Sequence, residues 1–94
     1  MTYRINKAQL ESMVERINEA TGHPLEAWTK QEDGTYKVNI GTYVLDWAYG
    51  GVRLSQMTGE SGGQRDITGR GTKRETYERM ECYLKGIWNG RQEQ

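Results

Sequence analysis

The residues with the clearest chemical potential stand at positions 69–74, where two glycines alternate with an arginine before a threonine and two basic residues. A glycine-rich turn at a helix start leaves backbone N–H groups free at the positive end of the helix dipole, which binds phosphate or carboxylate readily. The glycine spacing and preceding strand of a P-loop are absent, so nucleotide hydrolysis is not predicted. An ordinary helix cap followed by solvated basic side chains is the alternative. The set predicted to bind an anion is Arg65, Arg70, Gly71, Thr72, Lys73, Arg74 and Tyr77.

A second candidate surface is the face of the predicted sheet that no helix covers. If residues 50–51 form a two-residue hairpin loop, Asp46 lies opposite Ser55, and Arg53 comes close to Asp46. Such a pair is either a surface ion pair or part of a face that contacts a partner. The residues predicted on this partner face are Lys37, Asp46, Arg53 and Ser55.

The other reactive side chains do not form a recognisable catalytic or metal-binding set. His23 has no second histidine or nearby cysteine to complete a metal site, and Cys82 is far from it in sequence. Glu75, Glu78 and Glu81 follow helical spacing beside basic residues, as on a solvated helix face. The sequence therefore predicts a protein that is not an enzyme and uses no cofactor or metal.

The composition predicts a single domain that spans residues 1–94 and resides in the cytoplasm. Basic and acidic residues number 13 each, so the formal net charge is zero, and the one cysteine cannot form an internal disulfide. No apolar run approaches the roughly 18 residues of a membrane-spanning helix. Aliphatic residues are few, but 3 Trp, 6 Tyr and 4 Met supply apolar surface to bury.

The elements that must position these residues begin with a helix at about 7–21. Asn6 and Gln9 have the spacing of a capping box, apolar residues recur at helical intervals, and Gly22 marks the end. A helix followed by short strands is typical of an α+β domain.

From 27 to 57 the apolar period changes to two, and glycines at 34, 41, 50 and 51 divide the stretch into four short strands. Two-residue loops at 40–41 and 50–51 place Val38 opposite Tyr43 and Trp47 opposite Leu54. A three-residue loop at 32–34 adds Trp28 opposite Val38. These registers predict one apolar sheet face that carries Tyr36, Val38, Tyr43, Leu45, Trp47, Tyr49, Val52 and Leu54.

Residues 58–71 contain five glycines and no apolar periodicity, which predicts a flexible loop. Thr72 and Glu75 then form a second capping box, and the helix they open is predicted to end at Gly90. The expected architecture is a two-layer α+β fold in which an N-terminal helix, a four-stranded antiparallel meander and a C-terminal helix follow one another. Both helices are expected on the aromatic face of the sheet, which leaves the other face open and compatible with a homodimer.

Four short motifs resemble small uncharacterised proteins that occur repeatedly in tailed-bacteriophage genomes. They are Arg-Ile-Asn at 16–18, Gly-Thr-Tyr-Val-Leu at 41–45, Ala-Tyr-Gly-Gly-Val-Arg-Leu at 48–54 and Gly-Thr-Lys-Arg-Glu-Thr-Tyr at 71–77. The resemblance implies a phage or prophage accessory protein that acts in the bacterial host cytoplasm. Such families often contain antagonists of host defence. No catalytic residue is carried over.

The order helix, strands, helix also resembles the double-stranded-RNA-binding domain, whose second helix begins with lysines. Only Lys73 and Arg74 stand for that basic cluster, and residues 22–24 end a helix where the family has a loop between strands. The leading hypothesis is therefore an inhibitor-like binder of a host factor, either a defence protein or a nucleotide-type, phosphorylated signal. Nucleic-acid binding is the alternative, and zero net charge disfavours it.

Overall fold

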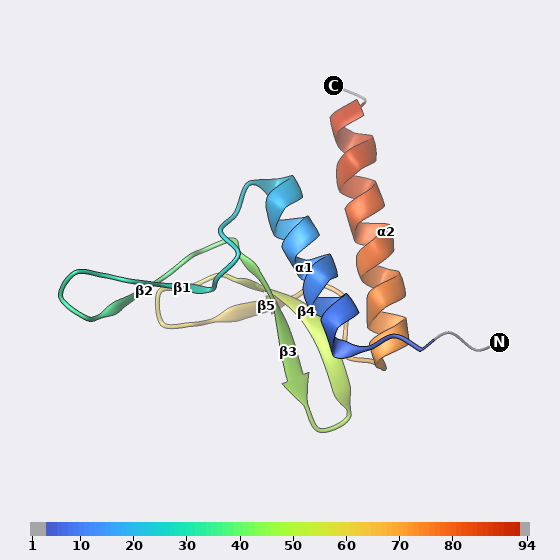
Figure 1. Ribbon diagram of the computed structural model, residues 1–94, viewed down its shortest axis with the longest axis horizontal. Helices are drawn as coiled ribbons and strands as arrows, with labels where there is room; N and C mark the ends of the chain where they lie inside the picture. The colour runs from blue at the N-terminus through green and yellow to red at the C-terminus, as the bar shows by residue number, and fades with distance from the viewer. Residues whose placement is uncertain (1–3, 93–94) are drawn as a thin grey trace.

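The computed structural model of this protein describes residues 4–92 and has an α+β fold, as the sequence predicts. The two helices lie side by side, and the strands lie between them in sequence (Figure 1). In chain order the elements are α1 (Lys7–Thr21), β1 (Trp28–Lys30), β2 (Tyr36–Val38), β3 (Tyr43–Ala48), β4 (Gly51–Met57), β5 (Gln64–Asp66) and α2 (Lys73–Gln92).

Both predicted capping boxes are present at the helix starts. At α1 the Asn6 side chain accepts a hydrogen bond from the Gln9 N–H at 2.8 Å, and the Gln9 side chain accepts one from the Asn6 N–H at 2.9 Å. Thr72 and Glu75 make the same reciprocal pair at α2. These local bonds satisfy backbone donors that a helix start leaves without partners.

The two helix ends differ in how well the sequence predicts them. α1 ends as predicted before Gly22, whose φ of 77° allows its N–H to reach the carbonyl groups of Asn18 and Glu19. α2 continues through Gly90 to Gln92, beyond the predicted end. A glycine inside a helix costs only about 1 kcal/mol relative to alanine, so it does not by itself stop a helix.

The strands form two separate antiparallel sheets rather than one four-stranded meander. β1 pairs only with β2, while β3, β4 and β5 form a second sheet in that order. The β1–β2 hairpin has the predicted three-residue loop, because Trp28 lies opposite Val38 and Gly34 has a φ of 88°.

The predicted pairing of β2 with β3 is wrong because the chain turns away from β2 before β3 begins. The Gly41 N–H donates a hydrogen bond to the Met57 carbonyl at 2.7 Å instead of closing a hairpin. Gly41 has a φ of 97°, and a Cβ there would lie 2.6 Å from Nε2 of His23. Residues 40–41 do form a two-residue turn, closed by a hydrogen bond from the Thr42 N–H to the Asn39 carbonyl at 3.1 Å, but the turn does not pair β2 with β3. The glycine is needed both for this turn and for close packing against His23.

The β3–β4 hairpin is present, but its register is shifted by two residues from the prediction. Trp47 lies opposite Val52 rather than Leu54. Gly51 belongs to β4 instead of the turn, and a Cβ on it would lie 2.2 Å from the Gly71 carbonyl oxygen. Since side chains alternate with a period of two, a two-residue shift keeps each side chain on its predicted face.

Four aromatic residues predicted on the apolar sheet face are exposed: Trp28, Tyr36, Trp47 and Tyr49. Tyr36 is 60% exposed because the β1–β2 sheet stands away from the helices. Tyr49 is fully exposed because the shifted register places it in the turn between β3 and β4. The core face of the larger sheet therefore carries fewer aromatic side chains than the sequence suggests.

The glycine-rich segment 58–71 contains a strand, although the sequence predicts only a loop. β5 pairs with β4, so that Ser55 lies opposite Asp66 and Met57 lies opposite Gln64. The three residues of β5 are polar and exposed. They lack the apolar alternation by which strands are recognised in a sequence.

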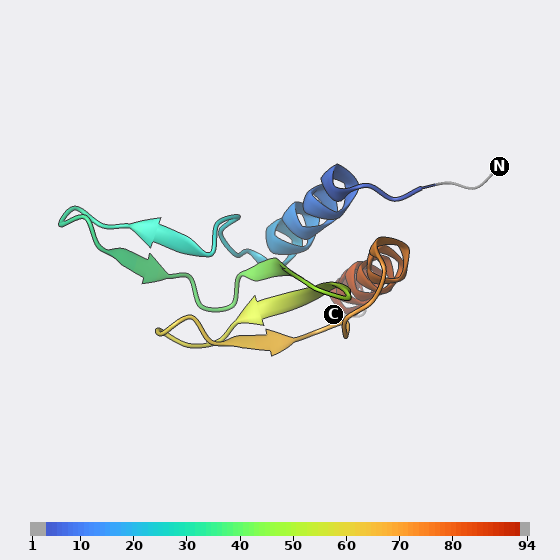
Figure 2. The same cartoon turned by 90° about the horizontal axis from the view of Figure 1, so that it is seen from below.

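Both helices pack on one face of the three-stranded sheet, as predicted (Figure 2). α1 contacts β3, α2 contacts β4, and the helices contact each other. This arrangement makes one core between two layers. Its buried members include Leu10, Met13, Val14, Ile17, Tyr43, Val52, Leu54, Met80 and Leu84.

One buried polar side chain fixes α1 to the sheet. The Asn18 side-chain amide donates to the Tyr43 carbonyl at 3.0 Å, and its oxygen accepts from the Tyr43 N–H at 2.7 Å. Asn18 thus replaces a neighbouring strand at the outer edge of β3 for this one residue. The Tyr43 hydroxyl then reaches across to the Tyr83 hydroxyl of α2 at 2.6 Å.

The β1–β2 hairpin, residues 28–38, projects from the two-layer body and is called the arm below (Figures 1 and 2). The molecule measures 52 × 40 × 20 Å and has a radius of gyration of 14.3 Å. A compact chain of this length is expected to have a radius of roughly 12 Å. The arm therefore makes the molecule more extended than a compact domain.

Replacing Asn18 with alanine should destabilise the protein by about 2–3 kcal/mol, because the N–H and C=O groups of Tyr43 lose their partners in a buried place. Asn39→Ala is the matched control. The Asn39 amide also donates two hydrogen bonds, to the Glu26 carbonyl and the Thr29 hydroxyl, but at an exposed site. Its loss should cost about 1 kcal/mol or less. Urea unfolding measures both variants, and equal losses would contradict the role assigned to Asn18.

Candidate functional site

The start of α2, which is the centre of the predicted anion site, is capped by the protein's own carboxylate. Glu75 accepts a hydrogen bond from the Thr72 N–H at 3.0 Å and pairs with Arg79 at 3.6 Å. The hydrogen bonds from the Thr72 backbone and side chain hold the pKa of Glu75 below its ordinary value. A carboxylate of this chain therefore lies where an external anion would bind.

Two of the basic side chains around that helix start, Arg65 and Arg74, have partners of their own. Arg65 donates a hydrogen bond to the Gln56 side-chain oxygen at 2.7 Å. Arg74 pairs with Glu78 one turn further along the helix at 3.2 Å. Lys73 is exposed to solvent. The three cations therefore extend from different places and do not converge on one ligand position.

Two further members of the predicted anion set have structural contacts. Gly71 exchanges both backbone hydrogen bonds with Val52, at 2.9 and 3.0 Å. Tyr77 is partly buried and packs against the core. Gly71 therefore extends the sheet beside β4, and Tyr77 helps to fix α2.

Arg70, from the predicted anion set, joins two residues of the predicted partner face. Asp46 Oδ2 lies 2.8 Å from Arg53 Nε and 3.1 Å from Arg70 Nη2. Arg53 also lies 3.7 Å from Asp66. The hydrogen bond from Arg53, together with the charges of both arginines, holds the pKa of Asp46 below its ordinary value. These four residues form a charged network across the sheet face opposite the helices.

The other two residues of the predicted partner face lie elsewhere. Lys37 belongs to the arm, which is a different sheet. Ser55 is fully buried, and its Oγ has no hydrogen-bond partner within residues 4–92. The shifted register also places Arg53 directly opposite Asp46, where the sequence predicted Ser55. Asp46 and Arg53 therefore lie together as expected, whereas Lys37 and Ser55 are not part of the same exposed surface.

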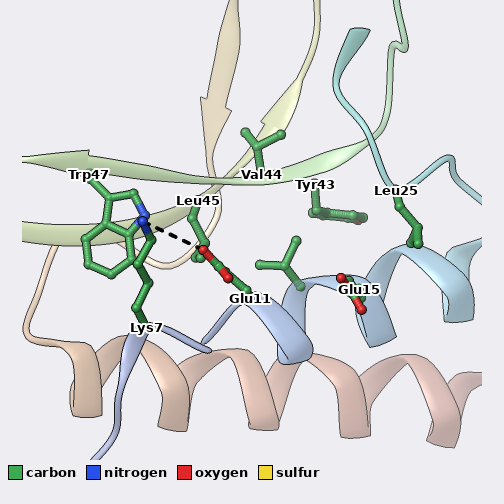
Figure 3. Close-up of a pocket in the computed structure, with 9 residues that line it drawn as sticks. Lys7, Glu11, Glu15, Leu25, Tyr43, Val44, Leu45 and Trp47 are labelled. Carbon is green, nitrogen blue, oxygen red and sulfur yellow. Dashed lines mark ion pairs between the residues drawn. The ribbon is translucent and has the colours of Figure 1, made fainter. Parts of the chain in front are cut away.

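Sequence reasoning missed a groove between α1 and β3, which has a volume of about 380 Å³ (Figure 3). One wall consists of charged side chains on successive turns of α1, and the other consists of apolar side chains of β3. Trp47 is 41% exposed and Leu25 is 49% exposed at its margins. The residues that define this α1–β3 groove are Lys7, Glu11, Glu15, Leu25, Leu45 and Trp47.

A second groove of about 330 Å³ lies along the arm. Its apolar lining includes Tyr36 and Ile40, which are 60% and 55% exposed, together with the buried Val38. Lys37 and Glu60 add one charge of each sign. This arm groove could have been suspected from the sequence only by recognising that residues 28–38 form a hairpin without a third strand.

Within residues 4–92 the structure has neither a metal-binding cluster nor a membrane-spanning helix. No group of three or more His, Cys, Asp and Glu side chains is placed to hold a metal ion. Neither described helix is long and apolar enough to cross a membrane.

A scan against protein-family models, a search of curated proteins and a search of solved structures each found no match for this chain.

Replacing Asp46 with asparagine should lower the free energy of unfolding by about 1 kcal/mol at pH 7, since Arg53 and Arg70 lose a shared anion. The folded-state pKa of Asp46 is below its unfolded value, so its contribution is complete above about pH 4 to 5 and disappears as the pH falls through the folded pKa. The difference between the proteins should therefore shrink on acidification. Urea midpoints from pH 7 to pH 2.5 measure this convergence.

Glu78→Gln is the control for that experiment because it removes an exposed ion pair within one helix. Its effect at pH 7 should be no more than a few tenths of a kcal/mol. A difference between Asp46→Asn and the natural protein that stays constant down to pH 2.5 would contradict the assigned role of the Asp46 charge.

Proposed function

We propose that this chain is a non-enzymatic phage accessory protein that counters host defence by stoichiometric binding of a host protein, and that the arm makes the contact. The phage origin rests on the motif resemblance. The choice of a protein partner rests on the shape and surface of the arm.

The observation that carries the proposal is a projecting two-stranded hairpin with exposed apolar side chains. An isolated two-stranded hairpin is at best marginally stable in water, so a stable arm benefits from further contacts. Trp28 packs beside Gly62 on the body, but Tyr36 and Ile40 extend beyond this support. Clustered exposed apolar groups beside polar ones are typical of protein-interaction surfaces. The arm groove therefore fits an apolar side chain of a partner.

The contacts at α2 favour a protein partner over a nucleotide-type, phosphorylated signal. The Glu75 carboxylate caps the helix start, and Arg70 is engaged with Asp46. A phosphate ligand would have to displace the Glu75 carboxylate and compete with Asp46 for Arg70. Nothing comparable fills the arm groove, so a protein contact there requires no such rearrangement.

The same ion pairs give little support to nucleic-acid binding. Affinity for nucleic acid depends on many basic side chains that neutralise phosphates. Arg53 and Arg70 are shared with Asp46, and the whole chain has no net charge. The charged network therefore presents both signs rather than a basic surface.

Replacing Tyr36 and Ile40 together with serine should abolish capture of the host protein, because the arm groove loses its exposed apolar lining. Both side chains are more than half exposed, so the fold should persist, as circular dichroism and thermal unfolding can check. The measurement is affinity purification from bacterial lysate with quantitative mass spectrometry. At least a tenfold loss of one specific host protein is expected, since interface hot spots cost about 1.4 kcal/mol or more.

The Lys73→Ala, Arg74→Ala double variant is the control, because it changes two exposed residues at the alternative site. It should capture the same host protein as the natural sequence. Native mass spectrometry of protein expressed in the host distinguishes the alternative ligand class. A small phosphorylated molecule retained by the natural protein and the arm variant, but lost from the α2 variant, would replace the proposed protein partner.

A further inference from the structure

β3 is an edge strand, and the backbone N–H and C=O groups of alternate residues along it face outward. The Tyr43 N–H and C=O bind Asn18 and therefore point away from β4. Because these directions alternate along an antiparallel strand, the groups of Leu45 and Trp47 also point away from β4. No hydrogen bond within residues 4–92 pairs them with another strand. The open part of the edge is thus short and clearly bounded by Asn18.

Three devices that commonly prevent pairing with another strand are absent from this edge. Natural edges are commonly protected by lysine, proline or a bulge. The segment Val-Leu-Asp-Trp-Ala at 44–48 contains no lysine or proline, and its pairing with β4 is continuous. Trp47 adds an exposed apolar surface beside the open backbone groups. The edge is therefore ready to accept one more strand.

The α1–β3 groove next to this edge has opposite charges at its two ends (Figure 3). Lys7 lies over the Trp47 ring, with Nζ 5.9 Å from the ring centroid. Glu15 and Leu25 lie toward the other end, near Tyr43. Glu15 has no ion-pair partner within residues 4–92, whereas Lys7 has only a long, exposed contact with Glu11 at 3.9 Å.

A two-fold axis at the middle of β3 would match these features with themselves. It would bring Lys7 of one copy to Glu15 of the other, and Trp47 of one copy to Leu45 of the other. The charge pair and the apolar contact would each form twice, which is the requirement for an interface between identical surfaces. Charge complementarity therefore identifies a second copy of this chain as the occupant.

We infer that two copies of this protein pair antiparallel through their β3 edges, with the axis at Asp46. In this register Leu45 of each copy exchanges backbone hydrogen bonds with Trp47 of the other. Their open groups are all used, and Tyr43 with its Asn18 contact stays outside the paired region. The two three-stranded sheets become one continuous six-stranded sheet. The exposed Tyr49 of each copy then comes over the Leu25 end of the other groove.

The register places the two Asp46 side chains next to each other on the face opposite the helices. Two bare carboxylates would repel there. Each Asp46 is already held by Arg53 and Arg70, and Asp66 balances the second arginine. The charged network is therefore neutral as a unit and permits the close approach.

Charge reversal tests the pairing without altering the core. Lys7→Glu places two glutamates against each other at each end of the interface, and Glu15→Lys places two lysines there. Each single variant should weaken the dimer by about tenfold or more, as two attractive pairs become repulsive. An equimolar mixture of the two single variants should restore association, because each end of the heterodimer then pairs a glutamate with a lysine.

The Lys7→Glu, Glu15→Lys double variant is the rescue, because exchanging both charges restores an attractive glutamate–lysine pair at each end of the interface. It should associate about as strongly as the natural protein, whereas each single variant should not. Sedimentation velocity between about 10 µM and 1 mM measures association, and circular dichroism checks folding. A double variant as weak as the single ones would contradict the proposed charge pairs.

Hydrogen exchange tests the strand pairing directly. The amides of Leu45 and Trp47 should be protected in the natural dimer and exchange rapidly in either single variant. The amides of Val44 and Asp46, which face β4, should stay protected in all of them. A natural protein that is monomeric at 1 mM would overturn the inference, and so would single variants that associate as strongly as the natural sequence. Capture of the host protein by the arm is measured separately, so either proposal can fail alone.

Discussion

The two hydrogen bonds between the Asn18 side chain and the Tyr43 backbone determine how the two layers meet. They join the molecule's first helix to the first residue of β3, at distances of 3.0 and 2.7 Å, and Asn18 is fully buried. A buried amide that is fully paired fixes orientation, because any sliding of α1 would leave polar groups without partners. The remaining contacts between α1 and β3 are apolar, and apolar contacts alone are less demanding of one position.

The same two bonds also explain why the chain has two sheets. Asn18 occupies the outer edge of β3 at Tyr43, which is where the sequence predicts pairing with Val38. β2 cannot pair there, so the chain crosses over at Gly41 against the His23 ring, and the hairpin leaves the body as an arm. One helix side chain therefore produces both an unsupported hairpin and a free strand edge, the two features from which binding is argued.

Sequence reasoning succeeded where the determining contacts are local. The capping boxes at Asn6 and Thr72 and the three-residue loop at Gly34 depend on residues a few positions apart. It failed at two glycines whose neighbours are distant in sequence. Gly41 lies in a turn as predicted but also packs on His23, and Gly51 packs on Gly71. Neither of these contacts can be inferred from a turn pattern in the sequence. Site residues were predicted by type, but their partners depend on register. Arg70 could not be assigned to Asp46 until the β3–β4 pairing was known.

The predicted β3–β4 register is wrong by two residues, but the prediction of which side chains lie on each face of the larger sheet is correct. A shift of two residues moves Asp46 from Ser55 to Arg53 while keeping it on the face opposite the helices. There it meets Arg70 from the segment before α2, and their charges largely cancel within the network. A surface whose opposite charges are paired with one another binds phosphate or nucleic acid only weakly. It leaves the apolar arm and the open edge of β3 as the surfaces where binding would gain most from excluding water.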